Sequence, residues 1–228
     1  VDAICAGFSG LERWFPKEKI ILTGNPIRSS IGEINGMKKA AVAEFGFSET
    51  APVVFIMGGS LGAKSMNLGV TNALQNWKER GYQVIWQTGK RYLKELQSSI
   101  DMTQFPNVKM LDFIERMDLA YAAADLIVSR AGAMSIAELA LVGKPTILVP
   151  SPNVSEDHQT KNALAMTENG AALLIKDKEV GKQLSNSVEE LMSSPQLLKE
   201  MGEKTKEFAK PNAAKDVVDA VERLVAKS

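Results

Sequence analysis

The stretch DLIVSRAGAMSIAELALVGKPTILVP, residues 125–150, contains a complete strand–helix–strand unit. Its two ends, DLIVS (125–129) and TILVP (146–150), are short apolar runs typical of buried strands. Between them, residues 136–142 are typical of a helix, which Gly143 ends, with Pro145 just beyond. A strand, a helix and a second strand in so short a stretch predict two parallel strands joined by a helical crossover.

The same alternation continues on both sides of this unit. The other apolar runs are PVVFIM (52–57), YQVIWQ (82–87), NVKML (107–111) and AALLI (171–175). Between the runs, helical segments are predicted over 66–77, 119–124, 136–142 and 161–169. After residue 175 no further strand is expected, and three helices are predicted over 179–192, 196–209 and 213–226. The pattern predicts an α/β fold, a Rossmann-like parallel six-stranded sheet with helices on both faces.

The first fifty residues follow a different pattern. Residues 1–24 contain only two short strands, and we expect them to be the last elements of a preceding domain. Residues 25–50 are interpreted as an interdomain connector and a first helix, residues 51–210 as the main α/β domain, and residues 211–228 as a C-terminal helix that packs back on the preceding domain. Cys5 lies in an apolar strand and is expected to be a core residue. The chain does not begin with Met, which fits a fragment or a processed product.

Composition excludes several classes of protein. The chain has 228 residues, with 27 Lys and Arg balanced by 27 Asp and Glu, so it lacks the basic footprint of a general nucleic-acid binder. One cysteine and one histidine cannot form a structural Cys/His zinc site, and the sequence has no Asp-x-Asp pair for a metal. No apolar run reaches the length of about 20 residues that a membrane span needs.

Two glycine-containing loops follow predicted strands and open helices. In GGSLGA (58–63), glycines let backbone N–H groups approach a phosphate, and the helix N-terminus favours negative charge; a tight strand–helix turn is the alternative. In SRAGAMSIAE (129–138), Glu138 has the position of a carboxylate that accepts hydrogen bonds from a ribose diol. Periodicity alone favours a second interpretation, in which Ser135 and Glu138 form a capping box at the start of the helix.

Other polar residues carry weaker signals. His158 is the only side chain whose ordinary pKa suits proton transfer near neutrality, but no partner for it is evident, and a role at a helix N-terminus is the simpler interpretation. Gln159 and Asn162 follow the loop after the fifth strand. Arg28 lies in the connector, where a turn or surface role is the simpler interpretation. Arg130 is a candidate phosphate contact together with Lys64 and Lys90, although lysines and arginines are common near loops.

Several motifs, taken together and in this order, resemble the MurG family of glycosyltransferases. They are TGNPIR (23–28), GGSLGAKSMN (58–67), DFIERM (112–117), SRAGAMSIAELALVGKPTILVP (129–150) and DHQTKNA (157–163). The resemblance implies the two-domain GT-B architecture, with this chain as its C-terminal, donor-binding part.

The resemblance also implies a set of site residues. Residues on positions that the family uses for UDP-GlcNAc are Arg28, Gly59, Ser60, Ile114, Ala133, Met134, Ser135, Glu138 and Gln159. Neighbouring candidates are Gly58, Gly62, Arg130, Gly132, His158 and Asn162. In the family, the Ile contacts uracil through its backbone, the Glu holds the ribose hydroxyls and the Gln contacts the sugar. No metal or other cofactor is implied, and the catalytic base is expected in the other domain.

The implied activity is that of a hexosyltransferase. It transfers GlcNAc from UDP-GlcNAc to lipid I, with inversion, to give lipid II for peptidoglycan, and so serves cell-wall synthesis, cell shape and division. The acceptor lipid and the cytoplasmic face of the bacterial inner membrane are expected to be bound through the other domain, so this chain alone is expected to be inactive. Two alternatives stay open: a UDP-GlcNAc 2-epimerase, and the donor-binding subunit of a split glycosyltransferase.

Overall fold

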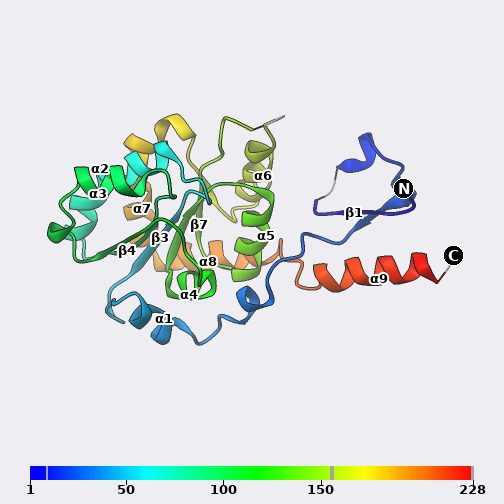
Figure 1. Ribbon diagram of the computed structural model, residues 1–228, viewed down its shortest axis with the longest axis horizontal. Coiled ribbons are helices and arrows are strands. Elements are labelled where there is room, and N and C mark those ends of the chain that lie inside the picture. The colour runs from blue at the N-terminus through cyan, green and yellow to red at the C-terminus, as the bar shows by residue number, and fades with distance from the viewer. Residues whose placement is uncertain (9, 155–156, 227–228) are drawn as a thin grey trace.

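A computed structural model describes residues 1–8, 10–154 and 157–226 of the chain (Figure 1). A large lobe contains a twisted sheet wrapped by helices, and a smaller lobe contains the N-terminal strands beside the last helix (Figure 1). Residues 155–156, in the predicted loop that precedes Gln159, and residues 227–228 of the predicted C-terminal segment lie outside the described residues.

The large lobe is built on a parallel sheet. Within the described residues it has six strands: β3 (Val53–Met57), β4 (Gln83–Gln87), β5 (Val108–Leu111), β6 (Leu126–Ser129), β7 (Thr146–Leu148) and β8 (Leu173–Leu174). Their spatial order is β5-β4-β3-β6-β7-β8, and every neighbouring pair is parallel. Numbered from β3, this is the 3-2-1-4-5-6 order of the doubly wound Rossmann fold. The predicted fold class and all six strands are confirmed.

Helices cover both faces of the sheet. They are α1 (Lys38–Glu44), α2 (Lys64–Glu79), α3 (Leu93–Ser99), α4 (Met117–Ala123), α5 (Ala133–Val142), α6 (His158–Thr167), α7 (Val180–Met192) and α8 (Pro195–Lys206). The last helix, α9 (Ala213–Val225), lies away from the sheet (Figure 1). Alternate residues of β3 face opposite cores: Phe55 packs with residues of α4 and α5, and Ile56 with residues of α2 and α7. The predicted helices are present, and α3 was not predicted.

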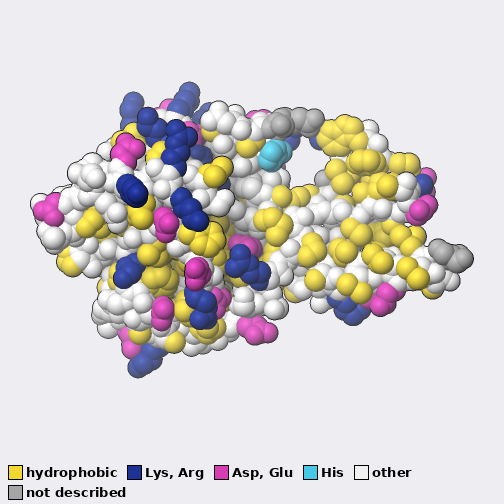
Figure 2. Space-filling view, viewed as in Figure 1, with side chains coloured by type: hydrophobic (Ala, Val, Ile, Leu, Met, Phe, Trp, Pro, Cys, Tyr) yellow, Lys and Arg dark blue, Asp and Glu magenta, His cyan; other side chains and the backbone are white. Residues whose placement is uncertain are grey.

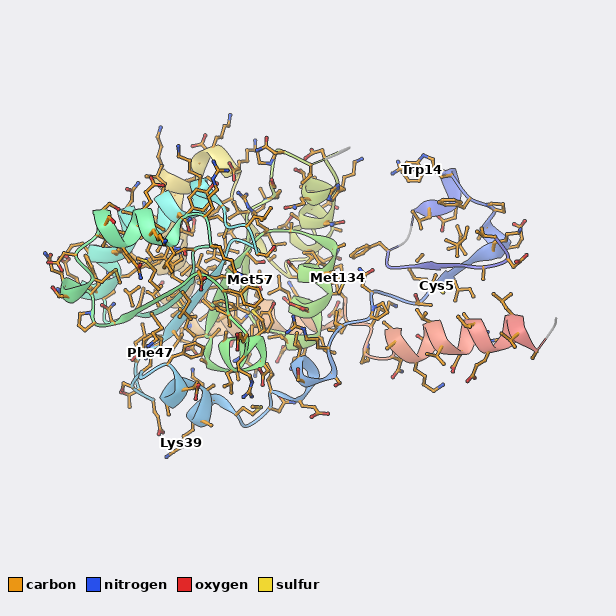
Figure 3. All side chains as sticks on the ribbon, in the orientation of Figure 1. Cys5, Trp14, Lys39, Phe47, Met57 and Met134 are labelled. Atoms are coloured by element: carbon orange, nitrogen blue, oxygen red, sulfur yellow. The ribbon has the colours of Figure 1, made fainter. Side chains whose placement is uncertain are left out.

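The smaller lobe contains β1 (Ile4–Ala6), β2 (Ile20–Leu22) and α9. Cys5 and Trp14 both belong to it (Figure 3). Cys5 is exposed, so the expectation of a core cysteine is wrong, because β1 and β2 form only a two-stranded sheet. Hydrophobic side chains gather on this lobe (Figure 2), and the exposed ones include Trp14, Leu22, Val218 and Val221.

Candidate functional site

The order of the strands places a crevice at the carboxyl ends of β3 and β6. The chain leaves the sheet in opposite directions on the two sides of this pair, and ligands of open α/β sheets bind at such a switch point. The loops that follow these two strands are residues 58–63 and residues 130–132, the two glycine-containing loops of the sequence. The topology therefore brings both loops to one edge of the sheet.

The loop after β3 needs its glycines for two reasons. Gly59 and Gly62 have positive φ angles of 84° and 75°, and the N–H of Gly62 donates to the carbonyl of Gly59 at 3.0 Å. A Cβ at Gly62 would overlap the carbonyl oxygen of Thr88, and one at Gly58 would lie 2.9 Å from the backbone nitrogen of Ala63. The loop is thus a tight turn, and Ser60 is exposed on it. No described side chain caps the N-terminus of α2 that follows.

The loop after β6 opens α5 in a similar way. Gly132 is the N-cap of α5, no described side chain caps it, and the first helical residue is Ala133. Ser135 and Glu138 therefore both lie inside the helix, so the capping-box interpretation is wrong. The backbone N–H groups of the first turn, in the Ala133–Ser135 segment, are left for another acceptor. Met134 in this turn is 49% exposed.

Glu138 lies half-buried on α5 and contacts a tyrosine of α4. The Tyr121 hydroxyl donates to Oε2 of Glu138 at 2.8 Å. Burial raises the pKa of Glu138, while the hydrogen bond from Tyr121 and the positive charge of Arg28 lower it in part. Burial, followed by the Glu138 charge, raises the pKa of Tyr121 well above its ordinary range. Arg28, exposed in the connector, thus acts electrostatically on both groups although it is more than 90 positions from either in the sequence.

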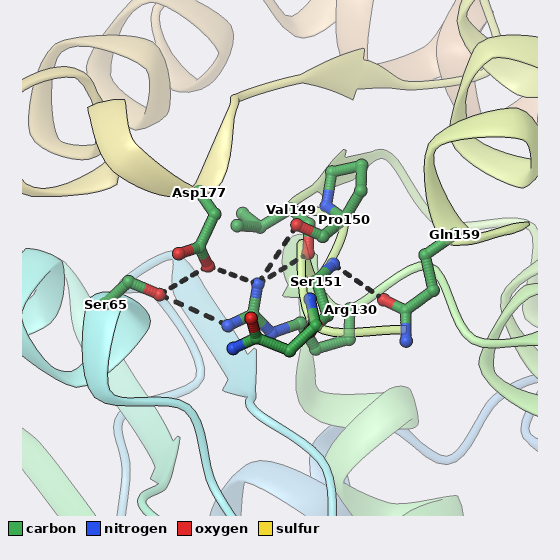
Figure 4. Close-up of polar contacts among 8 residues, drawn as sticks. Ser65, Arg130, Val149, Pro150, Ser151, Gln159 and Asp177 are labelled. Atoms are coloured by element: carbon green, nitrogen blue, oxygen red, sulfur yellow. Dashed lines mark hydrogen bonds and ion pairs between the residues drawn. The ribbon is translucent and has the colours of Figure 1, made fainter. Parts of the chain in front are cut away.

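Arg130, beside the second loop, is held in a network of charged and polar groups (Figure 4). Its guanidinium donates to Asp177 at 2.5 Å, to the hydroxyl of Ser65 at 3.2 Å, and to the carbonyls of Val149 and Pro150. Ser65 also donates to Asp177 at 2.5 Å. The network ties the first turn of α2 to the loops after β6, β7 and β8, so the guanidinium is engaged within the protein.

Gln159 and Asn162, on α6, brace the neighbouring loops. Oε1 of Gln159 accepts the backbone N–H of Ser151 at 2.9 Å, and the side-chain amide of Asn162 donates to the carbonyl of Ala131 at 3.0 Å. Gln159 and Arg130 line a polar cavity of about 310 Å³. The cavity is bounded by residues from several loops, among them Gly58, Gly62, Lys64, Tyr92 and Asn153.

Of the predicted site residues, Gly58, Gly62, Arg130 and Gln159 line this cavity, and the others, Glu138 among them, do not. Ile114 is buried in the core beside α4, at 3% exposure, so only its backbone is available to a ligand. His158 is the first residue of α6 and is exposed.

Ser65, Tyr121 and Asp177 were missed from the sequence, as were Tyr92, Ser151 and Asn153 of the cavity lining. Asp177 follows β8, the sixth strand, and reading the loop after that strand like the other five would have found it. Tyr121 and Ser65 lie within helices and carry no local signal.

The described part of the chain contains no group of three or more His, Cys, Asp or Glu side chains that could hold a metal ion. Within the same ranges, no helix is long and apolar enough to cross a membrane.

The fold and the crevice define a Rossmann-like domain with two uncapped helix N-termini at one edge of its sheet, an arrangement found in nucleotide-binding domains. The family profile described as "Glycosyltransferase family 28 C-terminal domain" matches residues 53–217. The chain therefore belongs to glycosyltransferase family 28.

Two similar proteins from bacteria share one enzyme name. The chain is 46% identical over 225 residues to the UDP-N-acetylglucosamine–N-acetylmuramyl-(pentapeptide) pyrophosphoryl-undecaprenol N-acetylglucosamine transferase of Porphyromonas gingivalis, covering 97% of the chain and 59% of that protein. The enzyme of the same name from Cytophaga hutchinsonii is 45% identical, with 99% and 60% covered. The chain thus spans about 60% of the length of these relatives.

Solved structures agree on the fold. The crystal structure of Acinetobacter baumannii MurG matches with a TM-score of 0.70 and 29% identity, covering 97% of this chain and 65% of that one. The UDP-GlcNAc 2-epimerase of Neisseria meningitidis, bound to UDP-GlcNAc, matches with a TM-score of 0.64 at 19% identity, covering 93% and 57%. At that identity the epimerase shows a shared fold alone. The resemblance to the MurG family and the GT-B type of fold are confirmed.

Proposed function

We propose that the whole protein transfers GlcNAc from UDP-GlcNAc to lipid I, forming lipid II, and that this chain supplies the donor site. One observation carries the proposal: two uncapped helix N-termini meet at the switch point of the sheet, with Glu138 on one of those helices. The names of relatives 45–46% identical to the chain, which specify an N-acetylglucosamine transferase, support the choice of substrates. The domain limits given above are part of the proposal, with residues 51–210 as the donor domain.

In this proposal the donor lies across the crevice. The diphosphate is bound by Gly59, Ser60 and the first turn of α5 from Ala133 to Ser135, because these backbone N–H groups and helix dipoles favour an anion. Glu138 accepts the ribose hydroxyls, the backbone of Ile114 contacts uracil, and Arg28 lies on the nucleotide side. Gln159 contacts the GlcNAc ring. Gly58, Gly62, Gly132 and Asn162 shape the loops, and His158 borders the sugar.

The reaction is a displacement at C1 of GlcNAc. The C4 hydroxyl oxygen of the MurNAc unit forms the new bond to C1, the bond from C1 to the UDP oxygen breaks, and UDP leaves with the electron pair. The hydroxyl proton passes to a base outside this chain, and the configuration at C1 inverts. The N-termini of α2 and α5 stabilise the charge that develops on UDP, a role that a metal ion fills in other enzymes.

The remaining parts of the proposal concern the rest of the protein. Lipid I and the cytoplasmic face of the inner membrane are bound outside this chain, which places the enzyme at the membrane periphery and in cell-wall synthesis, cell shape and division. We expect the 228-residue chain to bind the donor without forming lipid II.

Calorimetric titration of this chain with UDP, UDP-GlcNAc, UDP-GalNAc, ADP and NAD tests the donor site. We expect binding selective for the uridine nucleotides, weakened by Glu138→Ala by at least about tenfold, as loss of hydrogen bonds to a charged group predicts. Binding of ADP or NAD in preference to UDP would overturn the proposal. Incubation of the full-length protein with UDP-GlcNAc alone is expected to release no ManNAc, the product of an epimerase.

A further inference from the structure

Tyr121 is a buried tyrosine whose hydroxyl is directed at the carboxylate of Glu138. Its side chain has 0% exposure and stacks edge-on against Phe55, with ring centroids 5.6 Å apart. The hydroxyl oxygen lies 2.8 Å from Oε2 of Glu138 and 3.4 Å from the sulfur of Met57. A carboxylate is a much stronger acceptor than a thioether, so the single hydroxyl proton points to Glu138. Packing therefore fixes both the tyrosine ring and the direction of its hydrogen bond.

This contact limits the conformations that Glu138 can adopt. A glutamate side chain on a helix has several rotamers, and a half-buried one without a partner would turn toward solvent. The bond from α4 holds Oε2 in place and occupies one of about four acceptor positions of the carboxylate. Glu138 is half-buried, and the bond from Tyr121 is the one hydrogen bond of its carboxylate among the described contacts, which leaves the remaining positions, including both of Oε1, for a ligand. The pair thus presents a fixed carboxylate with free acceptors.

We propose that Tyr121 is a positioning residue that makes the site selective for ribonucleotides over deoxyribonucleotides, by holding the Glu138 carboxylate where it accepts both ribose hydroxyls. The inference rests on the proposed function, since it takes Glu138 as the ribose ligand. A fixed acceptor discriminates because a nucleotide that lacks the hydroxyls leaves the desolvated carboxylate unpaired. Without the Tyr121 hydroxyl, Glu138 is free to turn back toward water when a nucleotide without ribose hydroxyls binds, so its desolvation costs less. The difference in affinity between the two kinds of nucleotide is therefore expected to become smaller when Tyr121 is changed.

The test is a set of titrations with two ligands and three proteins. UDP and 2′,3′-dideoxy-UDP are titrated into the wild-type chain, Tyr121→Phe and Glu138→Gln. Tyr121→Phe keeps the ring and removes only the hydroxyl. We expect it to weaken UDP binding about five- to tenfold, the effect of one ordinary hydrogen bond, and to change 2′,3′-dideoxy-UDP binding less than about twofold. Tyr82→Phe is the control, because Tyr82 packs on the opposite core.

The outcomes distinguish a failure of the inference from a failure of the proposed function. Equal weakening of both ligands by Tyr121→Phe means that Tyr121 only supports the fold, and overturns the inference. Unchanged UDP binding in Tyr121→Phe, with a loss in Glu138→Gln, overturns the inference and leaves the proposed function standing. If Glu138→Gln binds UDP like the wild type, the assignment of Glu138 to ribose fails, and the inference with it. Thermal unfolding of each variant shows that the compared proteins are folded.

Discussion

Arg130 and Asp177 form an ion pair with 2.5 Å between Nη1 and Oδ1, and both side chains are largely withdrawn from solvent, at 14% and 22% exposure. The pair joins the loop after β6 to the segment after β8, and Ser65 brings the first turn of α2 into the same network. The loops that form the polar cavity are thereby held by contacts that lie 47 and 65 positions apart in the sequence.

Removing the acid of this pair is expected to destabilise the fold. Asp177→Asn leaves the guanidinium of Arg130 with its carbonyl partners but without a counter-charge, so we expect a loss of about 1–3 kcal/mol in the free energy of unfolding. Urea denaturation measures it. The control is Glu203→Gln, which removes the exposed pair with Lys199 and is expected to cost less than about 0.5 kcal/mol. Equal losses in the two variants would show that the network adds no stability.

The glycine loop allows a sharper comparison of two glycines with nearly the same φ. Gly62→Ala places a methyl group against the carbonyl of Thr88, whereas Gly46→Ala, at a φ of 71°, meets nothing within 4 Å. We expect Gly46→Ala to cost about 1–2 kcal/mol, the strain of a left-handed residue. Gly62→Ala is expected to cost more than about 3 kcal/mol, since the loop must shift, and to weaken UDP binding. Chemical denaturation measures the loss of stability in each variant, and titration measures UDP binding. Similar losses of stability in the two variants would contradict the crowding at Gly62.

The main features of the fold could be predicted from the sequence because they are local. Each strand is a run of apolar residues bounded by turn formers, and Gly143 with Pro145 ends α5 where predicted. The helix α3 was missed because it has only seven residues, so its apolar positions, Leu93, Leu96 and the C-cap Ile100, give a short pattern, and none of its residues is fully buried. The role of the glycines after β3 could also be predicted from the sequence, since it depends on the backbone geometry of a single turn.

The chemistry of Glu138 depends on contacts that the sequence does not display. The spacing from Ser135 to Glu138 matches a capping box, but α5 begins at Ala133, because Gly132 already has the extended backbone of an N-cap. The true partner, Tyr121, is 17 positions away on another helix. Cys5 illustrates the reverse case, because an apolar strand is buried only when other elements cover it.

A change at Gln159 is expected to separate sugar binding from nucleotide binding. If Gln159 contacts GlcNAc, Gln159→Ala removes the affinity that the sugar adds, so UDP-GlcNAc is expected to bind no more tightly than UDP. UDP binding itself is expected to change less than about twofold, because the diphosphate is held by backbone groups of other loops. Calorimetry with both ligands measures this, with the exposed neighbour change Lys161→Ala as the control. An equal loss for both ligands would show that Gln159 acts only by bracing the loop at Ser151.

The raised pKa of Glu138 predicts how stability depends on pH. Burial lifts this pKa above the ordinary value of 4.5, so the folded chain holds the proton more tightly than the unfolded chain. The stability that Glu138 contributes is present below that ordinary value and is lost as the pH rises through the raised pKa. We expect Glu138→Gln to lack this loss, so its free energy of unfolding increases relative to that of the wild type as the pH rises. Urea denaturation of both proteins, from below the ordinary pKa value to above the raised one, measures the difference in free energy of unfolding. A difference that does not change with pH would contradict a raised pKa of Glu138.

Binding of UDP is expected to have the opposite dependence on pH, because a ribose diol needs the ionised form of Glu138 as its acceptor. Affinity should fall as the pH drops through the raised pKa. The positive charge of Arg28 lowers this pKa, so in Arg28→Gln the fall is expected to begin at a higher pH than in the wild type, whatever the absolute affinity. Titrations at a series of pH values measure the midpoint, with Arg223→Gln on α9 as the control. An unchanged midpoint in Arg28→Gln would show that the charge of Arg28 does not affect the pKa of Glu138.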